Sequence, residues 1–263
     1  MDLGIKNKVA LVTAASQGLG KASAIELANE GVKLAICSRD QDKINQTAEE
    51  IQNLSGVEVL AVKADLDSTD DIENLIKEIE NKFNTVDILV NNTGGPKAGF
   101  FDDLSDEDWL KTFESTFLSA VRVTRKVLPF MKKNKWGRII NISSVSAKQP
   151  IDNLMLSNGV RMSIHGWAKT LSNQVASENI LINNVCPGFT HTERVDALIK
   201  TQVENSNSSR EEIIESIASD IPAKRVGQAN ELAALVVFLS SEKASYITGQ
   251  SIAVDGGISS LPI

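Results

Sequence analysis

The sequence predicts an α/β fold in which a mostly parallel, doubly wound sheet carries helices on both faces. Short apolar runs alternate along the chain with segments whose apolar residues recur at helical spacing. Right-handed crossovers between such strands place helices on both faces of a parallel sheet. The 263 residues contain no internal repeat and no low-complexity linker, so we expect residues 1–263 to form a single domain.

Seven segments have the composition of strands that are buried on both faces. They are rich in Val, Ile, Leu and Ala, and polar residues or glycines bound them. The expected strands are Val9–Val12, Val32–Cys37, Val57–Val62, Val86–Asn91, Arg138–Ser143, Leu181–Cys186 and Ser251–Val254. They predict a sheet of seven strands.

Helical patterns fill most of the intervals between these strands. The longest runs from Trp109 to Met131 and carries one apolar stripe. The segment 188–222 is different, because it is polar and irregular apart from a short helix with Glu211 and Glu212 in its first turn. Long inserts in compact domains often close over a ligand, so we expect 188–222 to be a substrate lid.

Composition excludes several classes of function. A net charge of −7 argues against nucleic-acid binding, and no apolar run reaches the length of a membrane span. We therefore expect no nucleic-acid or membrane partner, and without a signal-peptide core we expect a cytoplasmic protein. Cys37 and Cys186 lie far apart in apolar runs, which predicts two buried free thiols. The sequence contains no cluster of metal ligands, so we expect no metal.

The segment 9–20, VALVTAASQGLG, is the strongest single signal for function. An apolar strand leads into a turn of small residues with Gly18 and Gly20, and a helical pattern follows. Such a turn lets the backbone approach a pyrophosphate, and the helix offers unpaired N–H groups at the positive end of its dipole. The segment therefore predicts a dinucleotide site.

Six ordered motifs then carry a family resemblance over the whole chain. Thr13–Gly20 resembles the pattern TGxxxGxG, with Ala14 at the first glycine, and Asp65 matches an adenine-binding aspartate. The other four are Asn91-Asn92-Thr93-Gly94, Asn141-Ile142-Ser143-Ser144, Pro187-Gly188 with Thr192, and Tyr246–Gln250 with Val254–Gly257. The chain resembles the short-chain dehydrogenase/reductase family, which implies a Rossmann fold, and is most similar to its 3-oxoacyl-carrier-protein reductase-like members.

The resemblance implies a nicotinamide dinucleotide bound along these motifs. The implied contacts are Thr13, Ala15, Ser16, Gln17, Gly18, Leu19, Gly20, Ser38, Arg39, Asp65, Leu66, Asn91, Thr93, Gly94, Arg161, Pro187, Gly188, Thr190 and Thr192. Ser38, rather than a carboxylate, ends the second strand, and Arg39 follows it. An arginine suits the 2′-phosphate, so NADP(H) is favoured over NAD(H), while Asp40 is expected to cap the next helix.

The chain departs from the family at the proton donor. The family's Tyr-x-x-x-Lys falls on Ser157 and Arg161, and its helical asparagine falls on Thr116. The one tyrosine of the chain, Tyr246, lies in the C-terminal motif. A serine hydroxyl is shorter and far less acidic than a phenol, and arginine does not release a proton.

A positioned general acid contributes about 10²- to 10⁴-fold in rate, so its loss weakens a reductase without abolishing hydride chemistry. The catalytic candidates are Ser144, Ser157 and Arg161. We expect Ser144 to polarise the substrate oxygen, Ser157 to organise a water-mediated proton path, and Arg161 to hold the ribose and supply charge. His191 is a weaker candidate for the missing acid, and Arg194 and Lys97 are weaker candidates for binding an anionic substrate; His165 is expected to be packed on its helix.

The sequence predicts an oxidoreductase that interconverts a carbonyl and a secondary alcohol, with 3-oxoacyl thioesters among the candidate substrates. Two alternatives stay open: a catalytically weak or inactive NADP(H)-binding sensor or regulatory protein, and an enzyme of the same fold with non-redox chemistry. The resemblance also implies a homo-oligomer, a tetramer or dimer assembled through the long helices.

Overall fold

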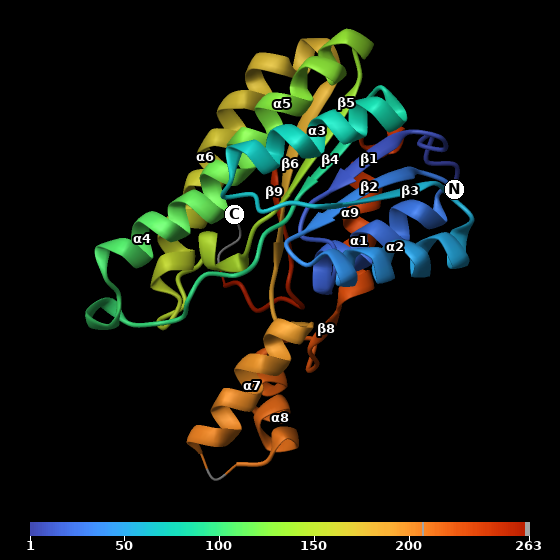
Figure 1. The fold of residues 1–263 in the computed structure, drawn as a ribbon. Helices are drawn as coiled ribbons and strands as arrows, with labels where there is room; N and C mark the ends of the chain where they lie inside the picture. Colours follow the sequence, from blue (N-terminus) through green and yellow to red (C-terminus); the bar gives the residue numbers. More distant parts are fainter. Residues whose placement is uncertain (207, 261–263) are drawn as a thin grey trace.

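The computed structural model describes residues 1–206 and 208–260, and within α7 it leaves six side chains undescribed, including that of Arg194. Seven parallel strands form one sheet in the order β3-β2-β1-β4-β5-β6-β9 (Figure 1). Their bounds are β1 (Val9–Val12), β2 (Lys33–Ser38), β3 (Val59–Lys63), β4 (Ile88–Asn91), β5 (Gly137–Ile142), β6 (Ile180–Pro187) and β9 (Ser251–Val254). All seven expected strands are confirmed, with small shifts at their ends.

Helices cover both faces of the sheet, as predicted. One face carries α1 (Gly18–Asn29), α2 (Gln41–Ser55) and α9 (Ala229–Leu239); the other carries α3 (Thr69–Phe83), α5 (Ser119–Asn134) and α6 (Met155–Val175). Each face has its own buried apolar cluster, for example Leu27 and Val236 on the first and Leu75 and Val127 on the second. Short 3-10 turns lie between these elements: η1 (Phe101–Asp103), η3 (Val145–Ala147), η4 (Ala176–Glu178) and η5 (Glu242–Ala244).

The long helix expected from Trp109 to Met131 is divided into three parts. The helix α4 (Asp106–Thr112) begins at the Ser105 cap, whose hydroxyl accepts from the Asp108 N–H. The π-helical segment η2 (Phe113–Leu118) follows and continues into α5. Within it Phe117 packs edge-on against Trp167 of α6 with ring centroids 6.1 Å apart, so the wider turn lies where the segment meets α6.

The segment 188–222 is more regular than the sequence indicates. It contains β7 (Thr190–His191), α7 (Glu193–Asn205) and α8 (Arg210–Asp220), and β7 pairs with β8 (Gly227–Gln228). The helix α8 was expected, whereas α7 was not, because its sequence is polar. Side-chain caps explain both starts: Thr192 caps α7 and Ser209 caps α8. Figure 1 shows α7 and α8 side by side, projecting away from the sheet.

Two further expectations concern burial. Cys37 and Cys186 are free and buried, as predicted. Burial raises the pKa of the Cys37 thiol to about 12 and that of Cys186 to about 11, so both stay protonated at neutral pH. Within the described ranges, no helix combines the length and the apolar character that crossing a bilayer requires.

Candidate active site

A ladder of polar side chains crosses the sheet from the last residue of β4, through β5 and β6, to the first residue of β9. Asn91 of β4 donates to Asn141 of β5, Asn141 donates to Asn184 of β6, and Asn184 donates to Ser251 of β9, each over 2.9 Å. These residues are also register partners in the parallel sheet. Ligands of open α/β sheets bind at the carboxyl edge. At β4 and β5 the ladder lies next to that edge, whereas Ser251 lies at the start of β9. The ladder's one signal at the level of the sequence is the presence of polar residues inside apolar strands.

The turn after β1 is fixed by its contacts with the end of β4. The Thr13 hydroxyl donates to the Asn92 carbonyl over 2.7 Å and accepts from the Asn92 N–H, while the Asn92 amide donates to the Ala14 carbonyl. A Cβ added to Gly20 would lie 2.6 Å from that same carbonyl, so only glycine allows α1 to approach the turn. Gly18 has a φ of +58°, in the left-handed region that favours glycine.

The residues present fit a bound pyrophosphate. Gln17 precedes α1 without capping it by its side chain, and the first turn of α1 contains no acidic residue. The N–H groups there are therefore not capped by that side chain, and the dipole favours an anion. Gly18 also faces the start of α7, because a Cβ on it would lie 3.5 Å from the Oε2 atom of the exposed Glu193 side chain and 3.6 Å from the Thr192 Cγ2 atom. The structure thus brings together two segments predicted to bind cofactor.

The end of β2 offers an arginine, and the neighbouring Asp40 carboxylate caps α2. The buried Ser38 hydroxyl donates to the Asp40 carbonyl over 2.8 Å, and Asp40 caps α2 by accepting from the Lys43 N–H. The expected capping role of Asp40 is confirmed. Arg39 is exposed, and its charge reaches Asp67 beside the predicted adenine site at Asp65. Asp65 accepts from the Asp67 N–H over 3.1 Å, and Leu66 packs against the apolar cluster below.

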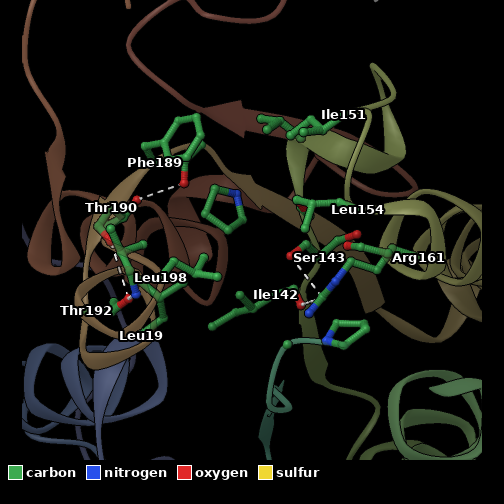
Figure 2. A pocket seen from close by; sticks show the side chains of 18 of the residues that line it. Leu19, Ile142, Ser143, Ile151, Leu154, Arg161, Phe189, Thr190, Thr192 and Leu198 are labelled. Atoms are coloured by element: carbon green, nitrogen blue, oxygen red, sulfur yellow. Dashed lines mark hydrogen bonds between the residues drawn. The ribbon is translucent and has the colours of Figure 1, made fainter. Parts of the chain in front are cut away.

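A cavity of about 470 Å³ opens beside this edge. Its lining includes nine of the predicted site residues: Leu19, Thr93, Ser144, Ser157, Arg161, Pro187, Gly188, Thr190 and Thr192. Figure 2 shows Phe189, Thr190 and Leu198 on one side and Ile151, Leu154 and Arg161 on the other. The other predicted cofactor residues lie outside this cavity, along the turns described above.

Ser144 and Ser157 line the cavity, and Ser146, outside the described lining, joins them. Ser144 precedes η3, and its hydroxyl accepts from the Ser146 N–H over 3.0 Å, which leaves its own proton available to a substrate oxygen. The Ser157 hydroxyl lies 2.8 Å from the Ser146 hydroxyl, and both side chains are buried. Ser146 was not singled out from the sequence, because only the fold brings it to Ser157.

Arg161 and His165 follow Ser157 on the same face of α6, one turn apart. The Arg161 guanidinium is buried and its Nη1 donates to the carbonyls of Ile142 and Ser143 at 3.1 and 2.9 Å. His165 Nε2 lies 2.9 Å from the Ser143 hydroxyl and 3.7 Å from the Cys186 sulfur. Burial, with Lys148 and Arg161 nearby, lowers the pKa of His165 to about 4, so its ring is neutral at pH 7.

Several other candidates take positions away from the cavity. Lys97 forms an ion pair with Asp108 over 2.8 Å, His191 lies half-buried on β7, and Thr116 is buried within η2. Asn91 turns its amide into the ladder rather than outward. The side chain of Arg194 lies outside the described residues. Within the described part of the chain, no three His, Cys, Asp or Glu side chains gather as a metal site requires.

The sheet order, the glycine turn and the cavity at the carboxyl edge together define the architecture of a dinucleotide-binding protein. The chain belongs to the short-chain dehydrogenase/reductase family, because the family model described as enoyl-(acyl carrier protein) reductase matches residues 13–259.

Similar proteins cover the chain almost from end to end. The NADPH-dependent reductase BacG of Bacillus subtilis is 35% identical over 96% of this chain and 98% of its own length. The 3-oxoacyl-[acyl-carrier-protein] reductase FabG of Aquifex aeolicus is 35% identical over 98% of this chain and 100% of its own. The structure of L-sorbose reductase from Gluconobacter frateurii, complexed with NADPH and L-sorbose, has a TM-score of 0.96 at 31% identity and covers 99% of this chain and 100% of its own.

Proposed function

We propose that this protein is an NADP(H)-dependent oxidoreductase that interconverts a carbonyl and a secondary alcohol. The observation that carries the proposal is the convergence of Ser144, Ser157 and Arg161 on one cavity, beside the Pro187–Thr192 segment that faces the glycine turn. Among the similar proteins, BacG is an NADPH-dependent reductase by name, and the structure of L-sorbose reductase is a complex with NADPH. When bound, NADPH supplies the hydride, and the residues of the chain orient the carbonyl and deliver the proton.

The cofactor assignment rests on the charge at the end of β2. Arg39 is the exposed cation there, and Asp40 is engaged in capping α2. We assign NADP(H) binding to the residues predicted from the sequence, with the pyrophosphate at the N-terminus of α1 and the nicotinamide near Pro187, Gly188 and Thr192.

The proton path differs from a phenol-based one. Ser144 donates to the substrate oxygen, and the Ser157–Ser146 hydroxyl pair holds a water that delivers the proton. Arg161 contributes positive charge and stays protonated, so it stabilises the developing oxyanion without releasing its proton.

Single-turnover oxidation of NADPH tests the function. Enzyme in excess is mixed with NADPH and a panel of aldehydes, ketones and 3-oxoacyl thioesters, and the loss of NADPH absorbance is followed. We expect oxidation with at least one carbonyl and a slower rate in Ser157→Ala. The control is Ser163→Ala, on the same helix, because the Ser163 hydroxyl donates to the Val160 carbonyl and is not part of the described cavity lining. Tight NADPH binding without oxidation across the panel would instead support the sensor function, which the missing phenol favours.

We also propose that the protein associates with a second copy through the outer face of α4, η2 and α6. Leu110 of α4, Phe113 of η2 and Met162 of α6 are exposed, and so is Phe101 of η1. Apolar side chains gathered over adjoining helices are typical of an interface between subunits. Light scattering measures the mass, and Leu110→Glu should lower it if the face is buried between copies.

A further inference from the structure

A turn near the end of the described chain closes the substrate side of the cavity. The residues Asp255–Ser260 follow β9, and Ile258 lines the cavity together with Phe189 and Leu198. The Asp255 carboxylate accepts from the N–H groups of Gly257 and Ser259 at 2.9 and 3.1 Å, which shapes the turn. This C-terminal turn therefore presents an apolar side chain to the cavity from a fixed backbone.

The C-terminal turn is held from two directions. On one side the Ser260 N–H donates to the Gln149 side-chain carbonyl over 2.7 Å, and Gln149 belongs to the loop after η3 that also lines the cavity. On the other side the Gly256 carbonyl accepts from the Ala223 N–H over 3.0 Å, just beyond α8. Gly256 has a φ of +63°, and a Cβ on it would lie 2.7 Å from the Ile221 side chain. The turn thus joins the base of the α7–α8 hairpin to the wall of the cavity that Gln149 forms.

Several of the side chains that line the cavity with Ile258 are apolar, and Gln149 and Thr190 add polar groups to the lining. Ile151 and Leu154 face Phe189 and Leu198 across the cavity (Figure 2). The hydroxyls of Ser144 and Ser157 and the guanidinium of Arg161 are contributed by the chain after β5 and by α6. Of the lining residues that the structure describes, Asp152 is the one with a carboxylate, and it is exposed.

We propose that Ile258 is a specificity-determining residue, and that the C-terminal turn selects ketones with an apolar body over polyhydroxylated ones. This inference rests on the proposed oxidoreductase function. The hydroxyl groups of a polyol placed against Ile151, Phe189 and Ile258 would lose water without gaining partners, which disfavours binding. An apolar ring or chain gains from leaving water at the same place.

The test compares kcat/KM for 4-ethylcyclohexanone and L-sorbose, with NADPH saturating. Wild type should prefer the cyclic ketone by about 100-fold or more. Ile258→Asn should lower that ratio by about tenfold, because the amide offers partners to hydroxyl groups and removes apolar surface. Ile247→Ala is the matched control, since Ile247 packs against the core and does not line the cavity in the described structure. Gln149→Ala removes the bond that holds the C-terminal turn at Ser260. It should also lower the ratio of the two kcat/KM values, by less than Ile258→Asn does.

The outcomes separate this inference from the proposed function. Equal or better reduction of L-sorbose by wild type would leave the oxidoreductase function standing and overturn the selectivity. An unchanged ratio in Ile258→Asn, with normal NADPH binding by fluorescence, would overturn the role of Ile258. Absence of NADPH oxidation with every carbonyl tested would overturn the proposed function and this inference with it.

Discussion

The hydroxyl oxygens of Ser157 and Ser146 lie 2.8 Å apart, and each side chain is almost fully buried. One hydroxyl must donate its proton to the other, which leaves the proton of the second hydroxyl available for a further hydrogen bond. Ser146 in turn donates its N–H to Ser144. Ser144 and Ser157 both line the cavity, and they are therefore joined through Ser146, which is absent from the described lining.

The first prediction concerns Ser146. Its replacement by alanine leaves the Ser157 hydroxyl without its partner and free to rotate, so we expect single-turnover NADPH oxidation to slow by about tenfold, a fraction of the contribution of a positioned proton donor. NADPH affinity should not change, because Ser146 lies outside the predicted cofactor contacts. Stopped-flow absorbance and fluorescence titration measure the two quantities. A rate equal to wild type would contradict the role of the hydroxyl pair.

Arg39 provides the second prediction. Charge-assisted hydrogen bonds contribute about 1.5–3 kcal/mol, so Arg39→Ala should raise the dissociation constant for NADPH by about 10- to 100-fold. The constant for NADH should stay within about twofold, since NADH lacks the 2′-phosphate. Binding of both cofactors is measured by the quenching of protein fluorescence. Equal weakening of both would show that Arg39 acts on the fold of the turn and not on the phosphate.

The third prediction concerns backbone strain at Ala14. Its φ of +47° lies in the left-handed region, which costs a non-glycine residue about 1–2 kcal/mol. Glycine relieves this cost but loses about 0.4–1 kcal/mol through the freedom of the unfolded chain. Ala14→Gly should therefore raise the free energy of unfolding in urea by up to about 1.6 kcal/mol. Asn84→Gly is the control, because asparagine already tolerates its φ of +58°. A less stable Ala14→Gly would show that the turn is not strained.

The asparagine ladder gives the fourth prediction. Asn141 is its centre, donating to Asn184 and accepting from Asn91, and it is buried. Asn141→Ala removes both bonds and leaves two buried groups short of a partner, which should cost about 2–4 kcal/mol. Ser251→Ala at the end of the ladder removes one bond and should cost about 1 kcal/mol. Urea unfolding measures both, and equal losses would contradict a shared ladder.

The strands and most helices could be predicted from the sequence because burial on both faces leaves a direct composition signal. The strand Val9–Val12 is apolar throughout, and its bounds match the structure. The helix α7 lacked such a signal. It lies in the hairpin that projects away from the sheet, so its sequence is polar, and its start is marked by the Thr192 cap alone.

The site was only partly predictable for a related reason. Ser144, Ser157 and Arg161 follow from motif positions, and all three line the cavity. The partners Ser146 and His165 depend on contacts across η3, β5 and α6, which no local pattern reports. Asn91 was assigned to the cofactor from its motif, yet its amide lies in the ladder, because parallel register places three asparagines side by side.

The last prediction concerns His165 and acid stability. Its pKa of about 4 in the folded protein lies below the ordinary value of 6.5, mainly because burial disfavours the charged ring. Between these two values the unfolded chain binds a proton that the folded protein does not, so stability is complete above pH 6.5 and falls as the pH drops toward 4. The shift corresponds to at most about 3 kcal/mol, and solvent at the half-buried ring makes about 2 kcal/mol a better expectation.

His165→Gln should remove this pH dependence while keeping a hydrogen-bonding group near Ser143. Urea unfolding of wild type and variant at pH 7.5, 6.5, 5.5 and 4.5 gives the difference in free energy of unfolding at each pH. We expect the advantage of wild type over the variant to shrink by about 2 kcal/mol across this range. His191→Gln is the control. It shows how much a histidine that does not contact Ser143 and Cys186 contributes to the pH dependence of stability. Parallel curves for wild type and His165→Gln would mean that His165 is not held neutral behind the Ser143 hydroxyl.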